Sequence, residues 1–127
     1  MPKASGKSFK FESEKSIRND FLETIKYEGG RQKVTLGYPE FNAVCPFSGL
    51  PDIGTLTIEY IPKRTVVELK SLKYYLVSFR NVGIYQEKAT DRIHSDLKKL
   101  LKPEAIKITL LYNTRGGIEA MCEAGEI

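Results

Sequence analysis

Apolar residues recur at every second position in three stretches of the chain, and this period predicts β-strands. The stretches contain Val34, Leu36 and Tyr38; Leu56, Ile58 and Tyr60; and Ile106, Ile108, Leu110 and Tyr112. Pro62 ends the second strand, because proline cannot donate to a strand ladder. Gly29-Gly30 predicts a hairpin turn before the first strand, and Arg115-Gly116-Gly117 predicts a turn into a short last strand near Ile118.

Between the second and third strands the apolar period becomes that of a helix. One apolar stripe comprises Leu69, Leu72, Leu76 and Phe79. A second helix is predicted from about Glu87 to Leu101, before Pro103, with an inward stripe of Ala89, Ile93, Leu97 and Leu100. Residues 41–52, FNAVCPFSGLPD, hold two prolines and a glycine and predict a loop.

The order strand, strand, helix, helix, strand, strand predicts an α+β domain, an antiparallel sheet with two helices on one face. No GxGxxG follows a strand, which argues against a dinucleotide-binding α/β unit. With 127 residues the chain has the size of one domain. Residues 1–20 are rich in Lys, Ser and Glu and predict a flexible N-terminal arm, which leaves residues 21–127 as the single folded domain.

Composition narrows the function classes. Twenty basic and sixteen acidic residues give a net charge of +4, which suits a phosphate-bearing ligand or nucleic acid, or only a solvated surface. No apolar run approaches the ~20 residues of a membrane span, and the first ten residues lack the apolar core of a signal peptide, so we expect a cytoplasmic protein without a membrane partner. Two cysteines and one histidine predict no metal site.

Cys45 and Asp52 are the first candidates for chemistry. Pro46 pushes Cys45 into an extended conformation, and the Gly and Pro before Asp52 favour a loop that folds back. A thiol and a carboxyl group that meet in this way can act as nucleophile and proton donor. The alternative is a buried, inert cysteine and a turn-forming aspartate.

The start of the first predicted helix is polar, with Glu68, Lys70, Ser71 and Lys73. Lys70 and Lys73 share the helix face opposite the apolar stripe, where they bind a ligand phosphate or are merely solvated. Glu68 binds a ligand or has only a structural role, because a carboxylate at a helix N-terminus is stabilised by the helix dipole.

Two further positions are candidates for ligand binding. The carboxylate of Glu87, after Gln86, can accept two N–H bonds from a purine-like or pterin-like edge, or can be an ordinary acidic residue at a helix start. Arg115 beside two glycines binds a phosphate or forms a turn.

The order of these motifs resembles one known family. PEFNAVCPFSGLPDIGTLTIEYIP, then VELKSLKYYLVSFRN, then QE at the next helix and TRGGI, is similar to the NADPH-dependent 7-cyano-7-deazaguanine reductases of queuosine biosynthesis, in their unimodular form. The likeness runs from about Val34 to Ile118. It implies a tunnelling fold that assembles into homo-oligomeric rings, with active sites between subunits.

The resemblance also implies roles for single residues. Cys45 matches the nucleophile that forms a thioimide with the nitrile, and Asp52 matches the proton donor. Two hydride transfers from NADPH then give 7-aminomethyl-7-deazaguanine. Cofactor binding falls to Lys70, Ser71, Lys73 and Arg115. Binding of the deazapurine substrate falls to Val67, Glu68, Leu69, Gln86 and Glu87. The family commonly has His-Glu where this chain has Gln86-Glu87, and Gln cannot titrate near neutral pH.

Three other functions are alternatives to nitrile reduction. The related amidinotransferase of archaeosine formation shares the thioimide but uses ammonia on a tRNA-borne nitrile; the ELKSLKYY segment argues for the reductase, and NADPH binding separates the two. An RNA-binding module needs exposed aromatic rings on adjacent strands, whereas Tyr60 and Tyr112 fall in register with core residues, so no direct nucleic-acid partner is expected. A cyclohydrolase of the same fold needs metal-binding His and Cys residues that this chain mostly lacks.

Overall fold

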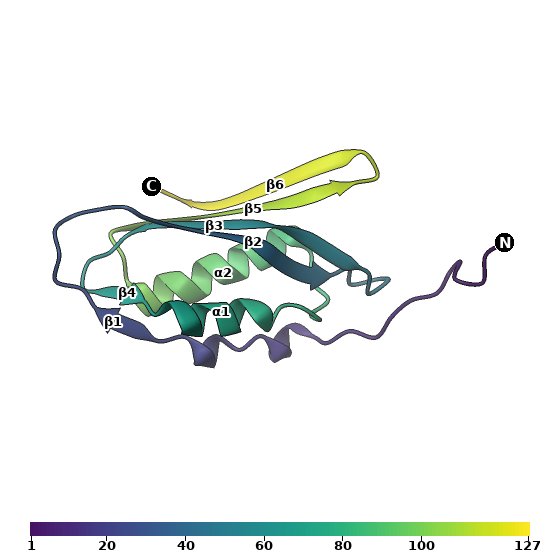
Figure 1. Ribbon diagram of the computed structural model, residues 1–127, viewed down its shortest axis with the longest axis horizontal. Coiled ribbons are helices and arrows are strands. Elements are labelled where there is room, and N and C mark those ends of the chain that lie inside the picture. Colours follow the sequence, from purple (N-terminus) through teal and green to yellow (C-terminus); the bar gives the residue numbers. More distant parts are fainter.

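The computed structural model describes residues 1–127 and contains a four-stranded antiparallel sheet with two helices on one face (Figure 1). The sheet has the order β2-β3-β5-β6, from β2 (Val34–Val44), β3 (Pro51–Ile61), β5 (Ala105–Arg115) and β6 (Ile118–Glu126). The helices are α1 (Leu69–Val77) and α2 (Gln86–Leu101). The predicted α+β class and the positions of both helices are confirmed.

A second, two-stranded sheet lies at the end of the molecule away from the β2–β3 turn (Figure 1). It pairs β1 (Thr24–Lys26) with β4 (Thr65–Val67) in antiparallel register. The predicted hairpin at Gly29-Gly30 is therefore wrong, because the two extended stretches that flank the glycines pair with other strands: β1 with β4 and β2 with β3.

The β2–β3 hairpin is longer than the sequence predicts. Residues 41–44 were predicted as loop, but they continue β2, because Phe41 and Ala43 are fully buried and pair with Gly54 and Asp52. A register shift between Tyr38 and Phe41 accommodates the irregular part of this edge strand. The connecting loop shrinks to residues 45–50, so Cys45 lies directly at the end of a regular strand.

One hydrophobic core lies between the sheet and the helices. The predicted inward faces are confirmed: the side chains of Leu56, Ile58 and Tyr60 on β3 are buried, as are those of Ala89, Ile93 and Leu97 on α2. On α1 the predicted stripe is partly wrong, because Leu69 is 60% exposed at the first position of the helix and Tyr75 is buried instead. The Tyr75 hydroxyl donates to Asp96 Oδ2 at 2.6 Å and so joins the two helices.

The N-terminal segment follows the outer side of α1 (Figure 1). It includes two single turns of 3₁₀ helix, η1 (Glu14–Ser16) and η2 (Asn19–Phe21), and it buries Ile17. Glu12 pairs with the segment after α1: its N–H donates to Asn81 O at 2.8 Å, and its carbonyl accepts from Gly83 N–H at 2.9 Å. The flexibility of residues 1–20 stays a prediction.

The chain ends in a nine-residue β6, whereas the sequence predicts a short last strand near Ile118. Its pairing with β5 runs from Ile106–Glu126 to Arg115–Ile118, with a shift between Tyr112 and Arg115. Neither helix has the length and apolarity that a membrane span requires.

Candidate active site

Cys45 lies in a tight loop that is closed by backbone hydrogen bonds between its own residues. Its N–H donates to Leu50 O and its carbonyl accepts from Gly49 N–H, both at 2.9 Å. Gly49 has φ +71°, and a Cβ there would lie 2.4 Å from the carbonyl oxygen of Phe9, so glycine is required. The Phe9 N–H in turn donates to Ser48 O at 2.7 Å. The loop is thereby fixed from inside and from the N-terminal segment.

The Cys45 thiol lies where backbone N–H groups favour its ionised form. The N–H groups of Ser48 and then Phe47 lower the pKa of Cys45 from that of a free thiol, against smaller opposing effects of burial and of the Asp52 carboxylate. The side chain is only half-buried. Cys45 therefore ionises more readily than a free thiol and is accessible, as a nucleophile requires. The amides of Phe47 and Ser48 are candidate functional groups that the sequence does not reveal, although a proline directly after a cysteine is a signal for such a turn.

Asp52 lies on β3 opposite Ala43, one pair from the loop. Arg115, at the end of β5, donates from Nη1 to Asp52 Oδ1 at 2.7 Å, and the aspartate side chain is only 13% exposed. This ion pair orients the carboxyl group through Oδ1 and leaves Oδ2 for contact with a ligand. Arg115 was predicted to bind cofactor phosphate; the structure places its guanidinium on the predicted proton donor.

Tyr112 is a further polar residue at this end that sequence reasoning assigned only to the core. The Arg115 guanidinium lies 4.8 Å above its ring, and the ring packs across Gly54, where a Cβ would lie 2.7 Å from Tyr112 Cδ1. The hydroxyl is buried without a hydrogen-bond partner, and burial raises its pKa. The hydroxyl therefore stays protonated.

Gln86 and Glu87 begin α2 beside β5 and β6. The Gln86 amide is buried, and its Nε2 donates to Leu110 O at 2.9 Å and to Ala120 O at 2.8 Å. Both of its N–H bonds are therefore used to attach α2 to the sheet. Glu87 is exposed in the first turn of α2. Its charge raises the pKa of the Cys122 thiol, after the larger effect of burial.

The predicted polar groups at the start of α1 are largely bound to backbone. Glu68 is the N-cap: its carboxylate accepts from Lys70 N–H at 2.8 Å and from Ser71 N–H at 2.9 Å. The Ser71 hydroxyl is buried, accepts from Glu23 N–H at 3.0 Å and donates to Glu68 O at 2.7 Å. The Glu68 side chain thus caps α1, and the Ser71 side chain holds α1 against the residue before β1.

The remaining predicted residues of this region differ in exposure. Val67 is buried, and its N–H donates to the Tyr60 hydroxyl at 3.2 Å, whereas Leu69 is exposed. Lys70 and Lys73 are exposed on the outer face of α1, and neither takes part in an ion pair. They are the free cations of this helix.

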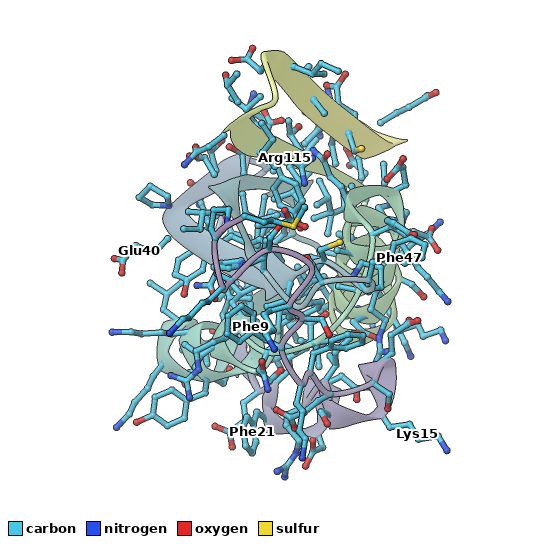
Figure 2. All side chains as sticks on the ribbon, turned by 90° about the vertical axis from the view of Figure 1, so that its right-hand side faces the viewer. Phe9, Lys15, Phe21, Glu40, Phe47 and Arg115 are labelled. Atoms are coloured by element: carbon cyan, nitrogen blue, oxygen red, sulfur yellow. The ribbon has the colours of Figure 1, made fainter.

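The structure thus separates the candidates into two groups. Cys45, Asp52, Glu87 and Arg115 lie at the end of the sheet that carries the β2–β3 loop, which faces the viewer in Figure 2. The candidates of residues 67–70 lie beside β4, at the other end (Figure 1). Between the two ends runs β3, whose eleven residues extend about 35 Å. One chain does not bring the two groups together.

Comparison with known proteins shows the family of the chain. The profile of the QueF-like protein family matches residues 51–126. The chain is 56% identical over 128 aligned residues to the NADPH-dependent 7-cyano-7-deazaguanine reductase of Thermotoga maritima, an alignment that covers 100% of this chain and 93% of that protein. It is 55% identical over 104 residues to the reductase of the same name from Chlorobium phaeovibrioides, across 80% of this chain and 90% of that protein.

A solved structure shares the fold. The apo form of the archaeosine synthase QueF-Like superposes with a TM-score of 0.67 at 22% identity, across 78% of this chain and 95% of that one. At this identity the likeness concerns the fold alone. The family profile and the full-length relatives decide the assignment: the chain belongs to the QueF-like protein family.

Proposed function

We propose that this protein is an NADPH-dependent reductase that converts the nitrile of 7-cyano-7-deazaguanine to an aminomethyl group, as the names of its full-length relatives state for those proteins. The observation that carries the proposal is the Cys45 thiol, whose pKa is lowered by backbone N–H groups, with Asp52 on the adjoining strand. A nitrile carbon is a modest electrophile, so it needs a thiolate and a nearby acid.

In the first step the Cys45 thiolate attacks the nitrile carbon. An S–C bond forms, one π bond of the nitrile breaks, and the nitrogen takes a proton from Asp52 Oδ2, which gives a thioimide. Arg115 holds the other carboxylate oxygen, Oδ1, at 2.7 Å, so it positions the acid during this transfer. The amides of Ser48 and Phe47 stabilise the thiolate before attack.

In the reductive steps NADPH, when bound, supplies two hydrides, one for each reduction of the former nitrile carbon. After the first hydride and a proton have been added, the nitrogen lone pair forms a C=N bond as the C–S bond breaks, and the leaving Cys45 thiolate returns to the N–H groups that stabilise it. The second hydride and a proton then complete the aminomethyl group. The chain fits this cofactor because Lys70 and Lys73 are exposed cations without carboxylate partners, as a phosphate ligand requires. Ser71 supports them indirectly, since its hydroxyl fixes the first turn of α1.

Substrate recognition falls to residues at both the β2–β3 end and the β4 end of the molecule. Glu87 is exposed and accepts N–H bonds from the amidine-like edge of the deazaguanine. Gln86 fixes the start of α2 and thereby the position of Glu87. Val67, Glu68 and Leu69 line the base on the other side, with exposed Leu69 as the apolar contact.

This assignment needs a second copy of the chain, because the two groups of site residues lie at opposite ends of β3. Homo-oligomerisation also suits the surface. Both β2 and β6 are edge strands without an outer neighbour. A hollow of about 480 Å³ beside β4 is lined almost entirely by apolar side chains, including Ile25, Leu36 and Leu69. We propose a ring in which the Cys45 end of one subunit meets the β4 end of the next.

The experiment that tests the proposed chemistry is intact-mass analysis after incubation with 7-cyano-7-deazaguanine in the absence of NADPH. The wild-type protein and Cys122→Ala should gain the mass of one substrate per chain, whereas Cys45→Ala should gain none. Adduct formation in Cys45→Ala, or its absence in the wild type, would contradict the thioimide mechanism.

The amidinotransferase of archaeosine formation is not favoured. The relatives identical at 51–56% all carry the name NADPH-dependent reductase. The likeness to the archaeosine synthase structure is 22% in sequence and concerns the fold.

A further inference from the structure

We propose that the hollow between α1 and the N-terminal segment binds the 2′-phosphoadenosine end of NADPH, with Tyr74 and Phe21 as the shelf for the purine and Arg80 as the ligand of the 2′-phosphate. This inference rests on the proposed function, which requires NADPH and assigns none of these three residues. It explains which part of the chain distinguishes NADPH from NADH.

The hollow has a volume of about 760 Å³ and is built from two separate chain segments. Its walls include Glu12 and Phe21 of the N-terminal segment, Lys73, Tyr74 and Val77 of α1, and Arg80 of the following turn. The N-terminal wall is attached to α1, because Arg18 N–H donates to Ser78 Oγ at 3.0 Å. Figure 2 shows Phe21 at the lower edge of the molecule, apart from Arg115.

Two aromatic rings meet edge to face in this hollow. The ring centroids of Phe21 and Tyr74 are 6.5 Å apart, with an angle of 67° between the rings. Tyr74 is 53% exposed and offers its ring to a planar partner. Phe21 is 37% exposed, and the Arg18 guanidinium lies 4.2 Å from its ring centroid, so Phe21 forms the edge of the shelf beside Tyr74. A purine stacks on such rings, because every base offers a π-face.

The charges around the rings suit a phosphate. Lys73 and Arg80 line the hollow and take part in no ion pair, against a single carboxylate, Glu12. Lys70 Nζ lies 5.9 Å from the Tyr74 ring centroid, on the same helix face. The planar fork of a guanidinium binds a terminal phosphate through two parallel hydrogen bonds, whereas a lysine acts as a point charge.

These observations assign the different phosphates of the cofactor to different cations. Lys70 and Lys73, which are expected to bind cofactor phosphate, are assigned to the 5′-diphosphate that links the two nucleosides. Arg80, one turn beyond α1, remains for the phosphate that only NADPH carries on its adenosine ribose. Arg80 is therefore the specificity-determining residue, and the shelf of Tyr74 and Phe21 sets the position of the ribose between the two phosphate groups.

The test measures binding of adenosine 2′,5′-bisphosphate and adenosine 5′-monophosphate to the full-length chain by calorimetry, in the absence of nitrile. Arg80→Gln should weaken the bisphosphate about tenfold or more, because a charge-assisted pair is lost, and leave the monophosphate nearly unchanged. Arg80→Lys should recover part of the loss. Tyr74→Ala and Phe21→Ala should weaken both ligands by about fivefold or more.

Matched controls exist in the chain. Tyr85 is also 53% exposed and meets Phe47 edge to face at 6.4 Å, so Tyr85→Ala removes an equivalent ring elsewhere. Arg64, in the exposed turn before β4, serves as the control for Arg80 through Arg64→Gln. Neither control should change the binding of either ligand. Melting curves of all variants check that the fold is kept, which is expected because every substituted side chain is at least one-third exposed.

The inference is overturned if the wild type does not bind the bisphosphate, if Arg80→Gln weakens both ligands equally, or if Tyr74→Ala binds like the wild type. Nitrile-dependent NADPH oxidation by the same wild-type preparation tests the proposed function separately from the subsite. Oxidation with unchanged bisphosphate binding in the variants rejects the subsite alone. Variant-sensitive binding without oxidation supports the subsite and rejects the reductase.

Discussion

At the β2–β3 end of the sheet, backbone amides and an ion pair hold the reactive groups but leave them accessible, whereas at the β4 end backbone groups occupy most of the polar side chains. The Cys45 thiol is surrounded by N–H groups, and Asp52 keeps one carboxylate oxygen for chemistry. Glu68 and Ser71, in contrast, have their oxygens bound to N–H groups and leave only the lysines free. In the proposed function the β2–β3 end carries the reactive groups together with Glu87, and the β4 end contributes only binding residues.

The largest effect is expected for the proton donor. Asp52→Asn keeps the size of the side chain but removes the acid, so thioimide formation should slow by about 10²–10⁴-fold, the usual contribution of general acid catalysis. Stopped-flow absorbance of the adduct measures this rate. The control is Asp91→Asn on the exposed side of α2, which should react like the wild type. A rate within twofold of the wild type for Asp52→Asn would remove Asp52 from the mechanism.

The separation of the two ends predicts complementation between inactive variants. Cys45→Ala and the double variant Lys70→Ala, Lys73→Ala should each be nearly inactive alone. If each site takes its cysteine from one subunit and its lysines from the next, random 1:1 reassembly restores roughly a quarter of wild-type activity. NADPH oxidation after mixing and refolding measures it. Activity no higher than that of the separate variants would place each site within one chain.

The buried amide at the start of α2 predicts a change in stability. Gln86→Ala leaves two carbonyls without their donor, so the free energy of unfolding should fall by about 2–3 kcal/mol. Urea denaturation measures the loss. Gln32→Ala is the matched control, because Gln32 makes one exposed hydrogen bond, to the Tyr27 hydroxyl, and its loss should cost under about 0.5 kcal/mol. Equal losses of unfolding free energy in the two variants would contradict a structural role for Gln86.

The two cysteines should differ in their rate of alkylation, an effect smaller than those above. The pKa of Cys45 is lowered by N–H groups and that of Cys122 is raised by burial and by Glu87. Below both pKa values Cys45 thus has the larger thiolate fraction, so iodoacetamide at pH 7 should label it several-fold faster. The difference should shrink as the pH rises and both thiols ionise. Peptide mass spectrometry follows both sites, and faster labelling of Cys122 would contradict the pKa order.

Much of the fold follows from residue periodicity, and the failures have physical causes. The alternation in β3 and the stripe on α2 are strong because one face of each is fully buried. The β1–β4 pairing was missed because contacts between short strands distant in sequence leave no local pattern. Leu69 was misassigned because side chains on a helix lean toward its N-terminus, so that of the first residue lines the hollow beside β4 and not the core.

The candidate site shows a similar division. Residue type and spacing made Cys45 and Asp52 candidates, because both belong to one hairpin, but only the family resemblance favoured catalytic roles over an inert pair. The contact of Arg115 with Asp52 was not, because it joins positions 63 residues apart. The backbone amides that favour the thiolate carry no side-chain signature, so only the three-dimensional loop reveals them.

The central claim is tested most directly by the stoichiometry of NADPH oxidation with 7-cyano-7-deazaguanine as limiting substrate, without tRNA or ammonia. The account predicts two NADPH oxidised per nitrile consumed, with 7-aminomethyl-7-deazaguanine as product and no oxidation by Cys45→Ala. Consumption of the nitrile without NADPH oxidation, or oxidation that persists in Cys45→Ala, would contradict it.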